Sequence, residues 1–365
     1  MRFNPLSCDI LPIIRTRITS LFFLILSFSL NYHCNQQSLE NVCDPNGKSF
    51  YETIVLKTIA YDSTPHCGTN VASNRNPGKV LGDGINWTSR SIPVGNWVSI
   101  AYGNGTFVAV ADGVGNTAVA TSTDGSNWTL RTMPVGAWWI SVTFGNGVFV
   151  AIASSGSTIG ATSTDGINWI QRTLPAPITG WQSVTFGNGL FVAIDIASNR
   201  AATSPDGINW TQRTLPSNNT WWAVTYGNGV YVAIETGNNV CVTSIDGVSW
   251  NLRILPSPSN WQSVIYGNGT FVTVADNGNI AATSSDGINW TTRTLPSSAN
   301  WYSVTFGNDI FVAIAYNSSK VATSPDGINW TARSLPTTAN WYTVTYGDGI
   351  FVALSYNSNI AATSP

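Results

Sequence analysis

The segment Trp261–Pro296 reads WQSVIYGNGTFVTVADNGNIAATSSDGINWTTRTLP and decides the fold. Short runs rich in Val, Ile, Thr, Phe and Trp alternate in it with turns made of Gly, Asn and Asp. This alternation is typical of β-strands joined by tight turns, and the segment has no apolar residues at helical spacing. It therefore predicts four successive strands, which we name a to d in chain order.

The same pattern recurs along most of the chain. An Asp-Gly-x-x-Trp pentad occurs seven times, at spacings of 41, 41, 41, 40, 40 and 40 residues, and a Gly-Asn-Gly turn or a near variant also occurs seven times. A period near 40 fits a propeller blade or a helical-pair repeat, and the strand composition selects the propeller. The pentads begin at Asp83, Asp124, Asp165, Asp206, Asp246, Asp286 and Asp326.

The two ends of the repeated region complement each other. The last repeat stops at Pro365, where Asp-Gly would follow, and the first pentad begins at Asp83 with a strand d of its own. Joined in a ring, this N-terminal strand would complete the last blade and remove an exposed sheet edge. We therefore predict an all-β fold over residues 79–365. It is a seven-bladed β-propeller of four-stranded blades, closed by an N-terminal outer strand that completes the last blade. An open array is the alternative.

The residues before the repeats predict export. Three arginines precede the apolar run Ile18–Leu30, which has 13 residues, whereas a membrane-spanning helix needs about 20. We predict a signal peptide over residues 1–29, with an uncleaved anchor as the alternative, and a Cys-containing segment over residues 30–78. The protein would then be secreted, periplasmic or on the cell surface, with no stable membrane insertion after signal cleavage. Three cysteines, Cys34, Cys43 and Cys67, allow one disulfide whose pairing the sequence leaves open.

Charge and composition exclude several classes of function. Only 9% of the residues are charged, the net charge is −2, and no run of Lys and Arg forms a basic stripe. Nucleic-acid binding is therefore not expected, because it requires neutralisation of phosphates. Both histidines, His33 and His66, precede the repeats, so the propeller has no histidine to act as a general base. We predict no metal site and no cofactor.

The longer motif Thr-Ser-x-Asp-Gly-x-x-Trp appears as TSTDGSNW at Thr121–Trp128 and as TSPDGINW at Thr203–Trp210. It resembles the Asp-box, or bacterial neuraminidase repeat, of sialidase-like β-propellers. The usual box has one more residue between Asp and Gly, and the first copy here has Leu81 where the others have Ser. The resemblance implies a structural role for the seven Asp residues, on the face away from the binding site. Their oxygens would accept hydrogen bonds from turn N–H groups.

The residues of a sialidase active site do not carry over to this chain. An arginine follows each pentad Asp by seven residues, which places all seven arginines on the outer strand d instead of in a central cluster. Four acidic residues remain at the b–c loops, and we interpret them as solvated loop residues: Asp112, Asp195, Glu235 and Asp276. We therefore predict a non-catalytic protein without catalytic residues. A divergent glycoside hydrolase, which would need a pair of carboxylates, is the remote alternative.

The two faces of the predicted propeller differ in variability. The a–b and c–d turns form a lower face that is nearly constant, while the b–c and d–a loops form an upper face that varies, and variable loops on a repeated scaffold usually carry binding. Strand a opens with a Trp, Trp138 in the second blade, which we interpret as packing. Its second residue varies and is often aromatic. The candidate ligand-binding residues are Trp139, Trp222, Tyr302, Tyr316, Asn317, Tyr342, Tyr356 and Asn357.

Aromatic faces accompanied by amide and hydroxyl groups suit sugar rings. We therefore predict an exported binding module whose upper face recognises carbohydrate in a lectin-like or adhesive role, with carbohydrate or a surface protein as its partner. A protein-interaction or assembly scaffold is the second hypothesis. Cys241 replaces an alanine of strand c, so we expect it to be a buried small side chain and not a nucleophile.

Overall fold

A computed structural model describes residues 81–365 except 155, 157 and 177–178. Within this part of the chain the secondary structure consists of β-strands, which confirms the all-β prediction. The predictions of a signal peptide over residues 1–29 and of a Cys-containing segment over residues 30–78 lie outside the described residues. In the described part, no helix is long and apolar enough to cross a membrane.

The strands form antiparallel sheets, four with four strands and one with nine. One sheet consists of β2 (Trp97–Gly103), β3 (Thr106–Ala111), β4 (Ala118–Ser122) and β5 (Thr129–Thr132). The next consists of β6 (Trp139–Gly145), β7 (Val148–Ala153), β8 (Ile159–Ser163) and β9 (Ile170–Thr173). A third consists of β10 (Trp181–Gly187), β11 (Leu190–Asp195), β12 (Ser198–Ser204) and β13 (Thr211–Asn219).

The nine-stranded sheet contains the following three repeats. Its strands are β14 (Trp221–Gly227), β15 (Val230–Ser244), β16 (Asn251–Gly267), β17 (Thr270–Ala275), β18 (Gly278–Ser284), β19 (Thr291–Gly307), β20 (Ile310–Tyr316), β21 (Ser318–Ser324) and β22 (Thr331–Ala339). Some strands that the sequence analysis separated are continuous here. β16 pairs with β15 through Asn251–Ile254 and with β17 through Trp261–Gly267, because the link between strands d and a remains extended.

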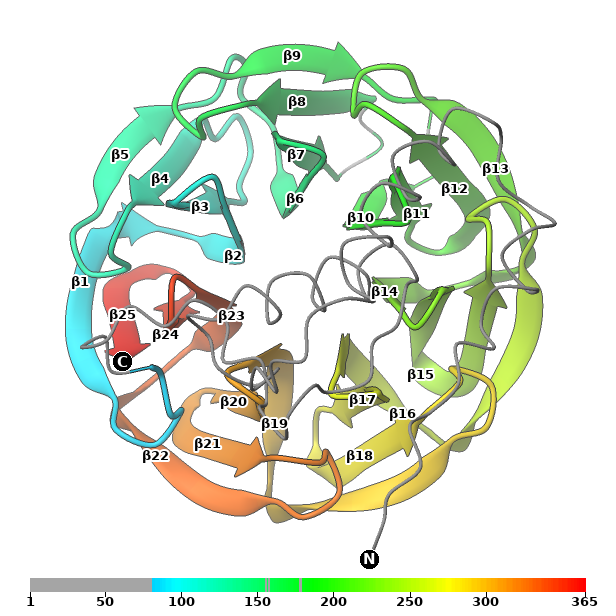
Figure 1. The fold of residues 1–365 in the computed structure, drawn as a ribbon. Coiled ribbons are helices and arrows are strands. Elements are labelled where there is room, and N and C mark those ends of the chain that lie inside the picture. The colour runs from blue at the N-terminus through cyan, green and yellow to red at the C-terminus, as the bar shows by residue number, and fades with distance from the viewer. Residues whose placement is uncertain (1–80, 155, 157, 177–178) are drawn as a thin grey trace, which may run out of the picture. The chain divides into compact units, whose positions relative to one another are not determined.

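The last sheet combines the two ends of the described chain. It contains β23 (Trp341–Gly347), β24 (Ile350–Ser355), β25 (Ser358–Ser364) and, hydrogen-bonded to β25, the first strand β1 (Thr88–Gly95). Around the centre of the repeated region, β2, β6, β10, β14 and β23 lie innermost, while β1, β5, β9, β13 and β22 lie outermost (Figure 1). This radial arrangement of sheets is that of a β-propeller.

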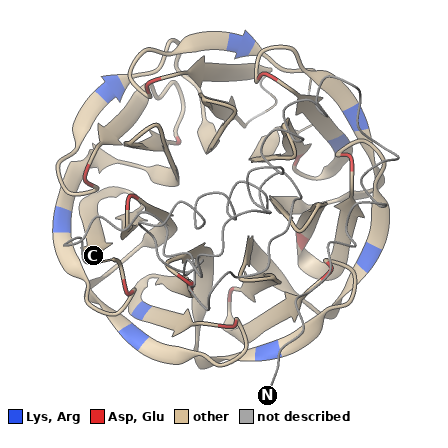
Figure 2. Ribbon diagram, in the orientation of Figure 1, with Lys and Arg blue, Asp and Glu red and all other residues tan. Residues whose placement is uncertain are grey.

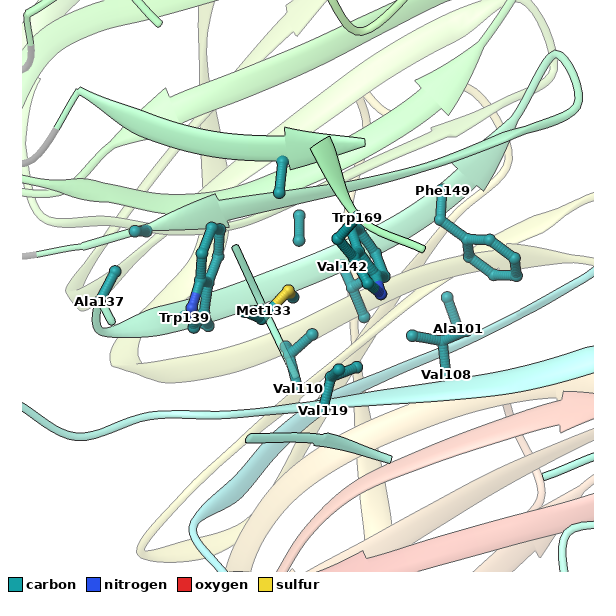
Figure 3. Packing of buried hydrophobic residues seen from close by; sticks show 13 residues of the cluster. Ala101, Val108, Val110, Val119, Met133, Ala137, Trp139, Val142, Phe149 and Trp169 are labelled. Atoms are coloured by element: carbon teal, nitrogen blue, oxygen red, sulfur yellow. The ribbon is translucent and has the colours of Figure 1, made fainter. Parts of the chain in front are cut away.

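The hydrophobic core lies between neighbouring sheets. In one cluster, Val108, Val110 and Val119 of one sheet pack against Trp139 and Phe149 of the next (Figure 3). A fully buried tryptophan lies six residues before the glycine turn on the innermost strand of every repeat. Because each cluster draws residues from two neighbouring repeats, no single repeat buries its own apolar face, and the repeats stabilise one another.

Innermost strands of successive repeats approach very closely at their lower ends. A Cβ atom at Gly103, the last residue of β2, would lie 2.1 Å from Cγ of Phe144 in β6, and the equivalent glycine of each other repeat has the same contact. The pairs are Gly103–Phe144, Gly145–Phe186, Gly187–Tyr226, Gly227–Tyr266, Gly267–Phe306, Gly307–Tyr346 and Gly347–Tyr102. Only a residue without a side chain leaves room for the aromatic ring of the next strand, which is why the turn begins with glycine.

A hydrogen bond accompanies this contact between innermost strands. The Val142 N–H of β6 donates to Ser99 Oγ of β2 at 3.1 Å, and the same Ser–Val pair recurs between other repeats. The serine hydroxyl oxygen of one repeat thus accepts a hydrogen bond from a valine N–H group of the next repeat.

The Asp-Gly-x-x-Trp pentads form compact turns between the third and fourth strands of each repeat. Asp124 Oδ1 accepts hydrogen bonds from the N–H groups of Ser126 and Asn127 at 2.8 Å and from Ser122 Oγ at 2.9 Å. The indole of Trp128 donates to the Gly125 carbonyl at 3.0 Å. The other pentads repeat this arrangement, so their Asp residues hold the turn and the tryptophan together.

The first pentad obtains its serine from the other end of the chain. Ser364 Oγ, in β25, donates to Asp83 Oδ1 at 3.0 Å, as Ser122 Oγ does to Asp124. Arg90 Nε also donates to Thr363 Oγ1 at 3.0 Å. The leucine at position 81 is therefore no defect of the first motif, because the residue that completes this motif lies 281 residues further along the chain.

Cys241 lies in β15 and is fully buried and free, as the sequence predicted. Burial raises the pKa of its thiol to about 12. A thiol that stays protonated at neutral pH is a poor nucleophile.

The close contact between glycine and the next aromatic ring predicts that alanine is destabilising at this glycine but not at a glycine with free space around it. Gly227→Ala would place Cβ 2.0 Å from Cγ of Tyr266 and should lower the free energy of unfolding by about 1–3 kcal/mol, the usual cost of overpacking. The control is Gly278→Ala, where the nearest atom would lie 3.8 Å away. Thermal denaturation of both variants tests this prediction; equal midpoints for the two would contradict the contact.

The hydrogen bonds to the pentad carboxylates stabilise the fold only while these groups are ionised, so we expect this stabilisation to be lost in acid. Burial alone would raise the pKa of Asp286, but its hydrogen bonds, chiefly from the N–H groups of Asn289 and Ile288, lower this pKa to about 2. In the unfolded chain the pKa is about 3.9. The folded pKa is the lower one, so the stabilisation is complete above pH 4 and is lost as the pH falls toward 2.

Asp286→Ala, which cannot titrate, should therefore be less stable than the wild type by about 1.5–3 kcal/mol at pH 7, the net value of hydrogen bonds to a charged group. The difference between the two thermal midpoints should shrink as the pH falls from 4 to 2. A difference that stays constant down to pH 2 would show that the carboxylate charge has no part in holding the turn.

Candidate ligand-binding site

One position on the upper face combines a constant backbone with a variable side chain. It lies at the upper end of the second strand of each repeat, and its N–H group donates to the carbonyl of the residue before the buried tryptophan, as Asp112 N does to Asn96 O at 3.0 Å. In the sixth repeat the same two positions pair between β19 and β20. The seven residues at this position are Asp112, Ser154, Ile196, Thr236, Asp276, Tyr316 and Tyr356.

A second variable position follows the buried tryptophan of each innermost strand. It is occupied by Val98, Ile140, Gln182, Trp222, Gln262, Tyr302 and Tyr342. In the sixth and seventh repeats both variable positions carry tyrosine, so four tyrosines come from two neighbouring repeats.

These four tyrosines form a single cluster, which we call the tyrosine cluster: Tyr302, Tyr316, Tyr342 and Tyr356. The ring centroids of Tyr302 and Tyr342 lie 4.5 Å apart, and their hydroxyl oxygens lie 3.3 Å apart. Tyr316 contacts Tyr302 at 5.6 Å, and Tyr356 stacks on Tyr342 at 5.4 Å. The structure thus brings together all four tyrosines that the sequence analysis selected.

Three phenols of the tyrosine cluster, those of Tyr302, Tyr342 and Tyr356, resist ionisation. Burial is the largest effect on Tyr302, Tyr342 and Tyr356, and it raises the pKa of each phenol above its usual value. The negative charge of Asp112 raises these pKa values further. The phenols therefore remain neutral, with aromatic faces that carry negative electrostatic potential.

Two carboxylates flank the tyrosine cluster. Asp276 belongs to the fifth repeat and Asp112 to the first, and the charges of both raise the pKa of Tyr302, after the larger effect of burial. Burial raises the pKa of Asp112, against opposing hydrogen bonds from Asn96 and Tyr356. Asp276 Oδ2 accepts from Gln262 Nε2 at 3.4 Å.

The other two acidic residues of the b–c loops are structural, and the interpretation of them as solvated is wrong. Asp195 is fully buried and accepts from the Gly180 N–H at 2.8 Å and from Thr179 Oγ1 at 3.0 Å. Glu235 is 3% exposed and accepts from Asn219 and from the Val240 N–H. Each replaces an alanine of other repeats and pairs with the buried tryptophan. Their carboxyl groups satisfy N–H donors of adjacent loops.

Trp139 is the buried tryptophan of its innermost strand and not a ligand-binding residue, which corrects the prediction. Its side chain is 0% exposed, whereas that of Trp138 is 41% exposed. Counting back from the turn reveals the error: Trp139 precedes Gly145 by six residues, as Trp97 precedes Gly103. The Trp-Trp pair concealed this register.

The remaining candidates lie around the tyrosine cluster without forming part of it. Trp222 is half-buried on β14, and an innermost strand that carries Gln262 lies between it and Tyr302. Asn317 and Asn357 are exposed and each has a φ of 50°. Asparagine is favoured in this left-handed conformation, so turn geometry alone accounts for both residues.

The seven arginines that follow the pentads lie on the strands at the outside of the repeats, as predicted (Figure 2), whereas Arg200 lies on β12. In six of the seven repeats the arginine Nε donates to a threonine Oγ1 of the neighbouring strand, as Arg213 does to Thr203 at 3.0 Å. These bonds are formed by Arg90, Arg131, Arg172, Arg213, Arg293 and Arg333. The arginines therefore do not converge on the tyrosine cluster.

Comparisons with known proteins support the fold. Residues 204–347 match the model of the DUF6242 beta propeller domain. No curated protein sequence matches the chain. Among solved structures, virginiamycin B lyase from Staphylococcus aureus is similar with a TM-score of 0.67 and 14% identity, over 76% of this chain and 99% of that chain.

A second similar structure is YCF48 from Cyanidioschyzon merolae, with a TM-score of 0.61 and 16% identity over 76% of this chain and 98% of that one. A structure of YCF48 bound to D1 peptide has a TM-score of 0.61 and 15% identity, over 76% of this chain and 94% of that chain. At these identities the similarity shows the β-propeller fold.

The two adjacent tryptophans provide a test of the corrected register. Trp139→Ala should lower the free energy of unfolding by about 3–5 kcal/mol, because it empties a fully buried site. Trp138→Ala removes a side chain that is 41% exposed and should cost less than about 1 kcal/mol. Chemical denaturation distinguishes the two; a larger loss from Trp138→Ala would restore the first assignment.

Proposed function

We propose that the protein is an exported, non-catalytic β-propeller module that binds its ligand at the tyrosine cluster. The observation that carries this proposal is the variable position after the second strand, which takes Asp, Ser, Ile, Thr or Tyr on a backbone held by the same hydrogen bond. A position that varies while its backbone is constant is free to serve recognition. The pentads on the opposite face vary little and form hydrogen bonds within their own turns.

The proposal includes a scaffold of seven blades that is closed between its first and last repeats. Three observations support this closure. β1 pairs with β25, Ser364 completes the pentad of Asp83, and Gly347 has the same contact with Tyr102 that the other glycines have with the next strand. A closed scaffold would hold the sixth, seventh and first repeats, which bear the tyrosine cluster and Asp112, at a constant separation.

Binding is favoured over catalysis by the use of the acidic residues. Asp195 and Glu235 are engaged in loop hydrogen bonds, and Asp112 and Asp276 each already take part in a side-chain hydrogen bond beside the tyrosine cluster. A glycoside hydrolase requires two carboxylates on either side of one bond. The neutral phenols are instead suited to contact a ligand through their rings and hydroxyl groups.

Two ligand classes follow from this site. Carbohydrate is the first, because four phenols offer both ring faces and hydroxyl donors. A protein segment is the second, and YCF48, a structurally similar propeller, has been solved with a bound peptide. Glycan arrays and peptide arrays, probed with the same preparation, separate the two classes.

A double variant tests the site whatever the ligand class. Tyr316→Ala with Tyr356→Ala removes one ring that contacts Tyr302 and one that stacks on Tyr342. Two aromatic contacts are worth about 0.5–1.5 kcal/mol each beyond area, so the affinity for an array ligand should fall about 5- to 150-fold. The protein should lose about 1–3 kcal/mol of stability, since the same rings pack on each other. Ile328→Ala on a pentad is the control; binding that persists in the double variant would place the site elsewhere.

A further inference from the structure

The side chains around the tyrosine cluster present hydrogen-bond acceptors that have no donor. Asp112 Oδ1, Asp276 Oδ1 and Gln262 Oε1 are buried, and within the described part of the chain none of them has a hydrogen-bond partner. The Gln262 side chain is 8% exposed, and its amide nitrogen is already directed to Asp276. A buried acceptor without a donor is costly, and a carboxylate oxygen is more costly than a neutral one.

The three unpaired atoms have the same chemical character. All of them accept hydrogen bonds and two of them belong to carboxyl groups, so the group that would satisfy them must donate N–H or O–H bonds and carry positive charge. Elsewhere on the upper face, the basic side chains of Arg200 and Lys320 donate to the carbonyls of Ala176 and Ser298. The chain thus uses these two cations for its own loops.

The tyrosine cluster offers a second attraction for the same kind of group. The aromatic faces of Tyr302, Tyr316, Tyr342 and Tyr356 lie between the two carboxylates in the ring order, and aromatic rings attract a cation placed within about 6 Å of the ring centre. A cation that also carries N–H groups would contact rings and acceptors together. A neutral sugar would leave the charges of both carboxylates without compensation.

The geometry points to a binding site for an organic cation that bears N–H groups, a primary ammonium or a guanidinium, held by the tyrosine cluster and by Asp112, Asp276 and Gln262. The inference rests on the proposed function and names the ligand chemistry of that site. A lysine or arginine side chain of a protein partner and an amino sugar are the two sources of such a group.

The test uses the full chain and capped five-residue peptides, measured by isothermal titration calorimetry. Gly-Gly-Lys-Gly-Gly should bind, and the same peptide with acetylated lysine should bind at least about tenfold more weakly, because acetylation removes the charge. Tetramethylammonium, which is charged but has no N–H group, should also bind more weakly than the lysine peptide. Chitosan oligomers form the amino-sugar arm; tighter binding by them than by the peptide would support the site and assign its ligand to a sugar.

Two isosteric variants connect binding to the carboxylates. Asp276→Asn and Asp112→Asn should each weaken the lysine peptide by at least about tenfold, since a hydrogen bond to a charged group is lost. Each variant keeps the size and shape of the side chain, so neither should change the free energy of unfolding by more than about 1 kcal/mol in the absence of peptide. Asp309→Asn makes the same charge change on an exposed lower-face turn and should bind normally.

Three results would overturn the inference: no binding of any cation, equal binding of the acetylated peptide, or unchanged binding by both Asp variants. If an array ligand without positive charge is lost in the Tyr316 and Tyr356 double variant while the lysine peptide does not bind, the proposed site stands and its assignment to a cation is wrong.

Discussion

The close approach of successive innermost strands is the constraint on which the rest of the structure depends. Where Gly227 meets the ring of Tyr266, the two backbones are nearer than any side chain would permit. The seryl hydroxyl two positions after the buried tryptophan accepts from the next strand and holds this distance. Both contacts lie on the innermost strands, so the remaining strands of each repeat extend outward from the centre. The apolar face of each repeat then packs against that of the next repeat.

This constraint separates the two faces of the scaffold. The lower face must repeat, since the glycine contacts and the pentad turns recur between every pair of repeats. On the upper face the backbone hydrogen bond at Asp112 and its equivalents involves no side chain. The residue there can therefore differ between repeats without disturbing the packing below, and the sixth and seventh repeats carry two tyrosines each.

Much of the fold could be predicted from the sequence, because a repeat displays its own register. The 40-residue spacing of Tyr302 and Tyr342 places them at equivalent positions of neighbouring sheets, which is why the tyrosine cluster could be foreseen. The Trp138-Trp139 pair conceals its register, because 42 residues separate Trp97 from Trp139 and only the distance to the glycine turn distinguishes the buried tryptophan from its neighbour. Leu81 stands where the other motifs have serine, and this departure indicated that the serine for Asp83 comes from elsewhere in the chain, namely Ser364.

Other features depend on partners that no spacing reveals. Asp195 and Glu235 looked like loop residues, yet each accepts from a loop that precedes it by 15 or 16 residues. The unpaired oxygens of Asp112, Asp276 and Gln262 are visible only once side chains are placed. Sequence composition therefore suggested a sugar, whereas the arrangement of acceptors around the tyrosines favours a cation that donates hydrogen bonds.

The most direct test of this account is a crystal structure of the protein soaked with the capped Gly-Gly-Lys-Gly-Gly peptide. We expect the lysine nitrogen within hydrogen-bond distance of Asp276 Oδ1 or Asp112 Oδ1, with its methylene chain against the rings of Tyr302 and Tyr342. The lower face should be empty and the backbone of the repeats unchanged. Peptide bound at the Asp-Gly-x-x-Trp turns, with the tyrosine cluster unoccupied, would contradict the account.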